Sequence, residues 1–368
     1  MSRQIFGPSA AALASLSSEQ IAFIQSLPKA ELHAHLNGCI PLSCLKGLAS
    51  TYIAEPGTVS SAAIDDGIQK LREGVNLETI GDFFSLFTAI YALTSTRENL
   101  ARATRAVLED FLDGADRQCT YLELRSTPRS TPHLSRAQYV ETVLDEVEKF
   151  PEDEVAYILS LDRKMPINVV SECIDIAIAS KLAGRRIVAI DLCGDPLAGD
   201  MNAFSEFIKK AKTAGLGLTL HVAETESNTA EETMQLLSLK PERLGHATFL
   251  DEEAKKFVFD NKIAIEICLT SNILCKTVKS PEDHHLNHHF SLSHPVAICT
   301  DDTLPFRNSL LGEYALLLAE KPIGLGLKEE DVRTIARMSM DSRFIVLNNH
   351  LVMGSIIPMR RTPGVHVV

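Results

Sequence analysis

Eight short apolar runs of strand length constrain the fold of this chain more than any other feature of its sequence. Most of them alternate with helix-length segments, such as 167–183, 202–214 and 251–261. This alternation is typical of a parallel sheet with crossover helices. Eight units predict an α/β fold closed into a (β/α)₈ TIM barrel, with an open doubly wound sheet as the alternative. The runs are 30–36, 119–125, 155–162, 187–194, 217–223, 243–247, 263–269 and 295–301.

The segment between the first two runs is longer than one crossover connection requires. Residues 77–91 and 97–111 have the amphipathic pattern of helices. We therefore expect residues 40–118 to form extra helices inserted after the first strand, on the side where barrel enzymes bind substrate. No linker, repeat or low-complexity block divides the chain, so 1–368 is expected to be one domain, with 350–368 as an irregular tail.

The charge balance limits the partners. Lys and Arg total 36 against 48 Asp and Glu, a formal net charge of −12. Because no basic run interrupts this balance, a nucleic-acid polymer and an anionic membrane are excluded as partners, whereas a small anion is not. The cysteines are scattered, and neither a signal peptide nor an apolar run of membrane-spanning length is present. We expect a reduced, cytoplasmic monomer.

A pair of histidines near the N-terminus gives the strongest chemical signal. His33 and His35 lie two residues apart on the first strand, so their side chains point the same way and could share one zinc ion. Such a pair also fits an edge strand with two surface histidines. However, His221 and Asp301 end the fifth and eighth strands. Catalytic residues of barrel enzymes come from several strand ends, so these four side chains predict one catalytic zinc ion per chain.

Three further residues complete a hydrolytic mechanism. Removing the 6-amino group of a purine requires a hydroxide at C6 and a proton on N1. Zinc lowers the pKa of bound water to about 7, and His246, at the end of the sixth strand, could accept the proton of that water. Glu224 would protonate N1, which requires a carboxyl pKa raised by apolar surroundings. Protonated Asp302 would donate to N7; alternatively, Glu224 starts a helix and Asp302 caps one.

Four motifs occur in a fixed order: His-x-His-Leu-x-Gly at 33–38, His-x-x-Glu at 221–224, Gly-His at 245–246 and Thr-Asp-Asp at 300–302. Together they resemble the adenosine deaminase family of metal-dependent barrel hydrolases. The segments 29–38, 122–129 and 245–250 look more like its adenosine deaminase-like branch, which is associated with N6-methyl-AMP. The resemblance covers about residues 27–302. It implies the ligand and catalytic roles given above, and it assigns Gly194 to the glycine whose backbone approaches purine N3.

One departure from the nucleoside enzymes bears on the substrate. Where they carry an Asp that binds the ribose 5′-hydroxyl, this chain has Asn37. A phosphate about 4 Å from that Asp would be repelled by about 4 kcal/mol at an effective dielectric constant near 20. Asn37 removes the repulsion and can donate to phosphate, although it could instead cap an inserted helix. The hydroxyls and the guanidinium of residues 126–129 could also bind phosphate.

These residues predict zinc-dependent deamination of N6-methyl-AMP to IMP and an amine. The alternatives are a deaminase of free adenosine or adenine and a zinc-binding protein without catalysis. The resemblance adds Tyr91 and Asp162 as weaker substrate contacts. The expected substrate-binding residues are His35, Asn37, Tyr91, Ser126, Thr127, Pro128, Arg129, Asp162, Gly194, His221 and Asp302.

Three features stand outside this scheme. The histidine-rich segment 284–289 is expected to be a solvated loop or lid rather than a second metal site. Glu123 and Arg125 alternate with leucines on the second strand and are expected to form an ion pair lining the barrel. Ala247 replaces the glycine that usually follows the catalytic histidine, which should tighten the backbone there.

Overall fold

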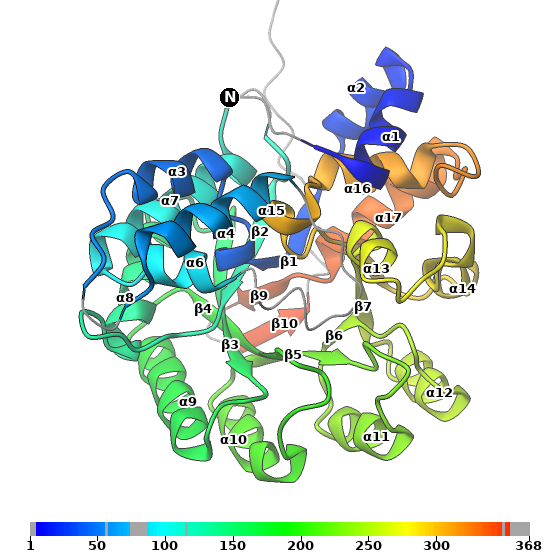
Figure 1. The fold of residues 1–368 in the computed structure, drawn as a ribbon. Helices are drawn as coiled ribbons and strands as arrows, with labels where there is room; N and C mark the ends of the chain where they lie inside the picture. The colour runs from blue at the N-terminus through cyan, green and yellow to red at the C-terminus, as the bar shows by residue number, and fades with distance from the viewer. Residues whose placement is uncertain (1–4, 56–57, 74–86, 115–116, 348–349, 354–368) are drawn as a thin grey trace, which may run out of the picture.

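The computed structural model describes residues 5–55, 58–73, 87–114, 117–347 and 350–353. Eight parallel strands, in the consecutive order β1 to β8, form a barrel with helices around its outside (Figure 1). The ring is completed beyond β8, where the Asp301 N–H donates to the His33 carbonyl at 2.9 Å and the His35 N–H donates to the Asp301 carbonyl at 3.3 Å. The TIM barrel prediction is therefore confirmed. The strands are β1 Ala30–His35, β2 Tyr121–Ser126, β3 Val155–Asp162, β4 Ile187–Cys193, β5 Gly217–Val222, β6 Arg243–His246, β7 Ala264–Ile267 and β8 Val296–Ile298.

Most of the crossover helices begin at a residue whose side chain caps the first turn, and they carry apolar residues on the face toward the strands. The Ser135 hydroxyl accepts the N–H of Gln138 at the start of α8, and Asp251 accepts the N–H of Ala254 at the start of α12. Their apolar faces pack against the outward leucines and valines of the strands. The outer helices are α8 Arg136–Val147, α9 Ile167–Leu182, α10 Met201–Thr213, α11 Ala230–Ser238, α12 Glu252–Asp260, α16 Leu310–Leu318 and α17 Glu329–Asp341.

Short elements and extra helices surround the C-terminal ends of the strands. Between β1 and β2 lie α3 Leu42–Ala49, α4 Ser61–Glu73, α6 Phe87–Leu93 and α7 Arg97–Leu112, which cluster on one side of the barrel (Figure 1). Of the helix expected over 77–91, residues 77–86 lie outside the described part of the chain, and 87–91 fall in α6. The remaining elements are α1 Gly7–Ser15, α2 Ser18–Ser26, η1 Leu36–Gly38, α13 Leu269–Leu274, η2 Pro281–Asp283, α14 Leu286–Ser291 and α15 Thr303–Phe306.

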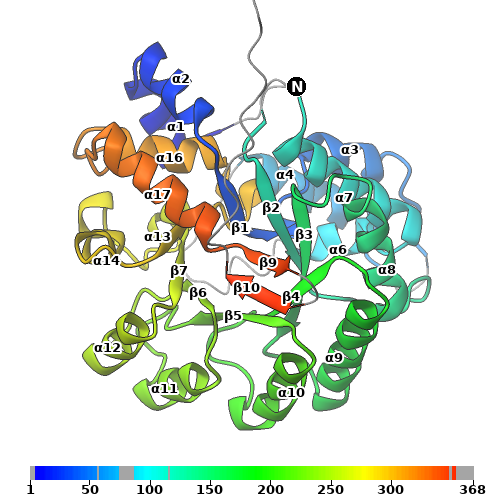
Figure 2. The ribbon, with the colours of Figure 1, turned by 180° about the vertical axis from the view of Figure 1, so that it is seen from behind.

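The N-terminal end of the barrel is covered by the hairpin of β9 Phe344–Leu347 and β10 His350–Met353 (Figure 2). The Phe344 N–H donates to Glu123 Oε1 at 2.6 Å, and the Tyr121 hydroxyl donates to the Phe344 carbonyl at 3.2 Å. Residues 350–353, the first of the expected irregular tail, therefore form a strand, β10, which pairs with β9. Phe344 of β9 closes the apolar N-terminal end of the barrel. Residues 354–368 lie outside the description. Among the described helices, none combines the length and apolar character needed to cross a membrane.

Paired charges fill part of the barrel interior. Arg125 Nη2 donates to Glu266 Oε2 at 2.8 Å, and Arg243 bridges Glu266 Oε1 at 2.7 Å and Glu123 Oε2 at 2.5 Å. The expected ion pair between Glu123 and Arg125 is therefore wrong. Both side chains line the barrel, but each one's partner comes from a strand other than β2. Removing one partner of such a pair typically costs about 3–5 kcal/mol.

Candidate active site

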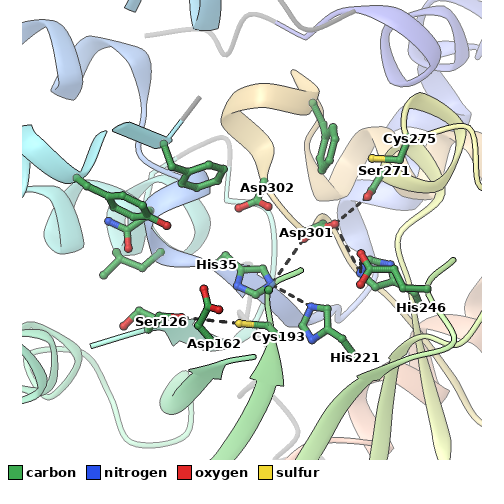
Figure 3. A pocket seen from close by; sticks show the side chains of 18 residues that line it. His35, Ser126, Asp162, Cys193, His221, His246, Ser271, Cys275, Asp301 and Asp302 are labelled. Carbon is green, nitrogen blue, oxygen red and sulfur yellow. Dashed lines mark hydrogen bonds and ion pairs between the residues drawn. The ribbon is translucent and has the colours of Figure 1, made fainter. Parts of the chain in front are cut away.

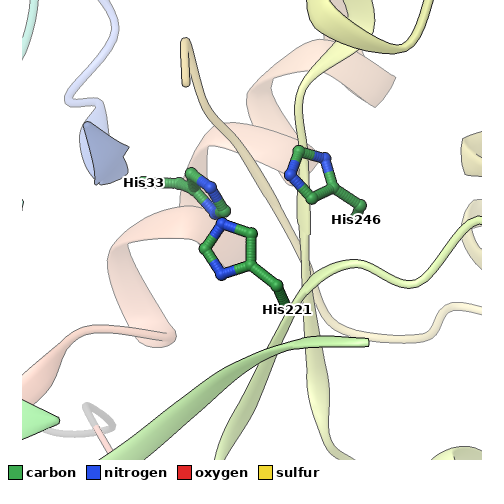
Figure 4. A group of neighbouring side chains, drawn as sticks. All are labelled: His33, His221 and His246. Carbon is green, nitrogen blue, oxygen red and sulfur yellow. The ribbon is translucent and has the colours of Figure 1, made fainter. Parts of the chain in front are cut away.

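Four side chains from three parts of the chain converge at the C-terminal end of the barrel. His35 Nε2 lies 3.3 Å from His33 Nε2 and 3.3 Å from His221 Nε2. Asp301 Oδ1 lies 3.7 Å from the Nε2 atoms of both His33 and His35. Figure 3 shows His35, His221 and Asp301 meeting, and Figure 4 shows His33 and His221 beside His246. Ligands at about 2.0–2.1 Å in a tetrahedral zinc site lie about 3.3–3.4 Å apart, so the spacing fits one ion.

Hydrogen bonds made by the other ring nitrogens leave these Nε2 atoms available to a metal. His33 Nδ1 lies 2.6 Å from Glu266 Oε2, and His221 Nδ1 lies 3.1 Å from Asp191 Oδ1. A histidine that donates from Nδ1 to a carboxylate keeps its Nε2 lone pair for a ligand bond. Burial lowers the pKa of His35 to about 3 and holds that of His33 well below its usual value, so both rings are neutral.

His221 differs, because burial disfavours its charged form but the Asp191 carboxylate raises its pKa to about 9. A proton on His221 Nε2 would be donated to His35 Nε2, which lies 3.3 Å away. A divalent cation would take the place of that proton.

The two supporting carboxylates, Glu266 and Asp191, are functional residues that the sequence analysis missed. Glu266 also accepts from Thr219 Oγ1 at 2.8 Å, and Asp191 accepts from Ser160 Oγ at 2.9 Å. Although burial opposes it, Arg125 and Arg243 hold the pKa of Glu266 well below its usual value. The signal was present in the sequence, since each is an acidic residue inside an otherwise apolar strand, and a buried charge requires a partner.

The two expected catalytic groups stand beside this cluster. His246 Nε2 lies 3.8 Å from Glu224 Oε1 and 3.8 Å from Asp301 Oδ2. His246, Ala247 and Asp301 have φ values of +59°, +50° and +62°, which place three non-glycine residues in the left-handed region. Ala247, which stands where a glycine is usual, therefore adopts the left-handed conformation that a glycine adopts without strain. Backbone strain of this kind costs about 1–3 kcal/mol per residue and concentrates at active sites.

A cavity opens above the cluster. Pro128 and Arg129 do not line it: Arg129 is exposed, with its guanidinium 3.7 Å from the centre of the Tyr91 ring. His33 lies buried beside the lining residues. The other expected residues line the cavity: His35, Asn37, Tyr91, Ser126, Thr127, Asp162, Gly194, His221, Glu224, His246, Asp301 and Asp302.

Three buried polar atoms of cavity-lining residues have no hydrogen-bond partner among the described residues, namely Asn37 Nδ2, Asp302 Oδ1 and His246 Nδ1. The Tyr139 hydroxyl donates to Asn37 Oδ1 at 3.3 Å, which leaves the amide N–H groups for a ligand. Burial, together with the neighbouring Asp301 charge, raises the pKa of Asp302 well above its usual value. Asp302 is therefore protonated and can donate to an acceptor.

The structure also decides between the capping alternatives. Asn37 lies inside η1, and the residue before α3 is Pro41, so Asn37 caps no described helix. Asp302 precedes α15, but its side chain makes no capping hydrogen bond. Neither side chain is therefore used as a helix cap.

Glycines allow the walls to come this close. A Cβ on Gly38 would lie 1.4 Å from Asp302 Oδ1, so the glycine of the His-x-His-Leu-x-Gly motif makes room for that carboxyl. Gly194 has a φ of +98°, and a Cβ there would lie 2.8 Å from Asp162 Oδ1. Bare backbone therefore faces the cavity at the end of β4.

Several lining residues carried no signal in the sequence, because apolar and small side chains are common throughout a globular chain. One of them has a clear contact: Ser271 Oγ donates to Asp301 Oδ2 at 2.7 Å. The lining residues that sequence analysis missed are Leu36, Phe87, Cys193, Ser271, Cys275 and Phe306.

The expectation of a solvated loop at 284–289 is wrong. His284 and His289 are buried, and residues 286–291 form α14. In the described part of the chain, the His, Cys, Asp and Glu clusters with ligand atoms within 4.8 Å of one another do not include these histidines.

Comparison with known proteins agrees with this geometry. The family model described as adenosine deaminase matches residues 28–356. The N6-mAMP deaminase of Arabidopsis thaliana is 34% identical over 349 residues, covering 88% of this chain and 94% of that protein. The N6-methyl-AMP deaminase of Mus musculus is 37% identical over 309 residues, covering 80% of this chain and 82% of that protein. Arabidopsis ADAL complexed with IMP superposes with a TM-score of 0.76 at 35% identity, covering 87% of this chain and 92% of that one.

Proposed function

Because this chain belongs to the adenosine deaminase family and is a deaminating hydrolase, we propose that it removes methylamine from N6-methyl-AMP in a zinc-dependent reaction. One water is consumed for each IMP and each methylamine produced. The observation that carries the proposal is that three imidazoles, each able to be neutral, and one carboxylate converge beneath a cavity. Buried polar atoms in the wall of this cavity have no hydrogen-bond partner among the described residues.

His33, His35, His221 and Asp301 would hold the zinc ion. When bound, zinc would activate a water molecule for attack at neutral pH. Glu266 and Asp191 fix the ring orientations of His33 and His221 through the Nδ1 contacts.

Proton transfer is assigned to His246 and Glu224. His246 Nε2 faces both Asp301 and Glu224, so it would take the proton of the attacking water and hold that water on one face of the purine. Glu224 would give its proton to N1, which allows C6 to accept the nucleophile. The amine would then leave from C6 with the proton held by His246, and the C6 hydroxyl would return a proton to Glu224 as the carbonyl of IMP forms.

The purine would be oriented by two contacts at its other edge. Protonated Asp302 would donate to N7, and the backbone at Gly194 would approach N3. With Glu224 on N1, these contacts would hold the ring on three sides, and a fixed ring orientation contributes strongly to rate.

The choice of a monophosphate over a nucleoside rests chiefly on Asn37. Its amide N–H groups have no partner among the described residues, and the side chain carries no negative charge, in contrast to a carboxylate at this position. Ser126 and Thr127 line the same cavity, and Arg129 lies stacked on Tyr91 beside it. The relatives support this choice, because one of them is an ADAL complex with IMP and another is an ADAL complex with GMP.

A three-substrate assay tests the proposal. Absorbance changes with N6-methyl-AMP, AMP and adenosine should give the highest kcat/KM for N6-methyl-AMP. If adenosine proves the best substrate, the argument from Asn37 fails. We further propose that the protein acts as a cytoplasmic monomer on a small purine nucleotide; light scattering and cell fractionation test these two points.

A further inference from the structure

We infer that His285 is a positioning residue for catalysis: its imidazole holds the backbone of His246 in the conformation that aims the water-activating ring. His285 Nε2 lies 2.8 Å from the carbonyl oxygen of His246. This inference rests on the proposed function, because it assigns a role to a residue that acts through His246.

The backbone that receives this hydrogen bond is strained. His246 and Ala247 lie in the left-handed region at φ +59° and +50°, where a non-glycine residue is disfavoured by about 1–2 kcal/mol. Such a conformation persists only when surrounding contacts hold it. A donor on the His246 carbonyl is one such contact, and it comes from His285, the residue directly before α14 and outside the catalytic cluster.

A second histidine supports the same loop along a different route. His284 Nδ1 accepts the N–H of Leu286 at 3.1 Å, so its Nε2 carries the proton and donates to Asn272 Oδ1 at 3.2 Å. Asn272 Nδ2 then faces Thr248 Oγ1 at 3.4 Å. We call His284 and His285 the histidine clamp. The clamp contacts residues 246–248 at both ends: His285 bonds to the His246 carbonyl, and His284 reaches Thr248 through Asn272.

The clamp is rigid because its two rings support each other. The rings of His284 and His285 stack with centroids 4.4 Å apart and planes 20° apart. In the part of the chain that the structure describes, buried His285 Nδ1 has no hydrogen-bond partner, which fits a neutral ring that donates only from Nε2. Burial lowers the pKa of His285 to about 4, so the ring stays neutral at pH 7.

A set of three variants tests the role of His285. In His285→Ala the His246 carbonyl loses its donor, and we expect kcat to fall about 10- to 100-fold, since small displacements of a catalytic group cost about that much. KM and the affinity for IMP should stay within about twofold, and zinc content should be unchanged. His285→Gln supplies an amide N–H to the same carbonyl and should recover most of kcat. His288→Ala changes an exposed histidine of the same helix and should be neutral.

Hydrogen exchange provides a readout that does not depend on turnover. Residues 246–250 should exchange faster in His285→Ala than in wild type, and His285→Gln and His288→Ala should match wild type. Unchanged kcat and unchanged exchange in folded His285→Ala would overturn the inference. The inference would also be overturned if kcat fell together with the zinc content and the His285→Gln variant did not restore it. A wild-type protein without activity would instead refute the proposed function, while exchange would still decide whether His285 holds the loop.

Discussion

At the scale of single residues, the candidate site depends on which atoms are left without partners. Asn37 Nδ2 and Asp302 Oδ1 are buried in the cavity wall without a donor or acceptor in the described chain. A buried polar group without a partner costs about 1–3 kcal/mol, so a ligand that satisfies both recovers that energy on binding. Under the proposed function, these two groups would help to select the substrate.

The first prediction concerns the charge at position 37. Asn37→Asp should lower kcat/KM for N6-methyl-AMP by about 10²- to 10³-fold, because about 4 kcal/mol of repulsion arises between carboxylate and phosphate. Activity on N6-methyladenosine, which has no phosphate, should change by much less. Asn37→Ala serves as the control that removes the amide without adding charge. Equal losses on the nucleotide and the nucleoside would contradict the assignment of Asn37.

The second prediction separates catalysis from metal binding. Glu224→Gln and His246→Ala each remove a group that transfers a proton, so kcat should fall by about 10²- to 10⁴-fold. Neither side chain is assigned as a ligand, so zinc content measured by atomic absorption should remain at the wild-type level. If both variants keep full turnover, the protein is a metal-binding protein and the proton-transfer roles are wrong.

At the scale of elements, strand ends were the most predictable feature. His221 and His246 lie on β5 and β6 at the ends expected from the apolar runs, because parallel strands bring their carboxyl ends to the same edge. Partners inside the barrel were less predictable. Arg125 pairs with Glu266 rather than Glu123, since contacts across the barrel depend on closure and register, which a single strand does not encode.

Helix α14 shows a second limit of sequence reasoning. A run of histidines between 284 and 289 has the composition of a solvated loop, yet His284 is buried and bonded to Asn272. The polar neighbours that satisfy these rings are far away along the chain. Their positions become known only once the barrel has formed.

The third prediction is that the buried histidines His285 and His289 lower the free energy of unfolding as the pH becomes acidic. Burial, the largest cause, lowers the pKa of His285 to about 4 and that of His289 to about 3, below the unfolded value of about 6.5. The unfolded chain therefore binds more protons between these values. Each ring contributes stability that is fully present above pH 6.5 and is lost as pH falls toward its folded pKa, by up to about 1.4 kcal/mol per pH unit.

Comparing wild type with a histidine variant separates the histidines' effect on the free energy of unfolding from the effect of two buried carboxyls, Glu31 and Glu313. Burial raises the pKa of Glu31 and Glu313 to about 7, so their contributions are lost in the opposite direction, as pH rises. Urea unfolding at pH 7.5 and pH 5.0 should therefore be compared between wild type and His289→Gln. The variant should lose less free energy of unfolding between the two pH values. Identical losses would show that His289 is not held neutral by the fold.

At the scale of the whole molecule, the barrel interior joins the β9–β10 hairpin to the proposed metal site. Arg243 donates to the Ser342 carbonyl at 2.9 Å near the hairpin and to Glu266, which lies beside the proposed ligand His33. Glu266 in turn contacts His33. Charged pairs in the barrel interior thus connect the closed end of the fold to the geometry of the site.

The central claim is that one divalent ion, held by His33, His35, His221 and Asp301, is required for deamination. The most direct test is to measure zinc content and N6-methyl-AMP turnover of the purified protein before and after treatment with a chelator. We expect one zinc per chain, loss of turnover together with the metal, and recovery of turnover when zinc is returned. Full turnover by protein shown to contain no divalent metal would contradict it.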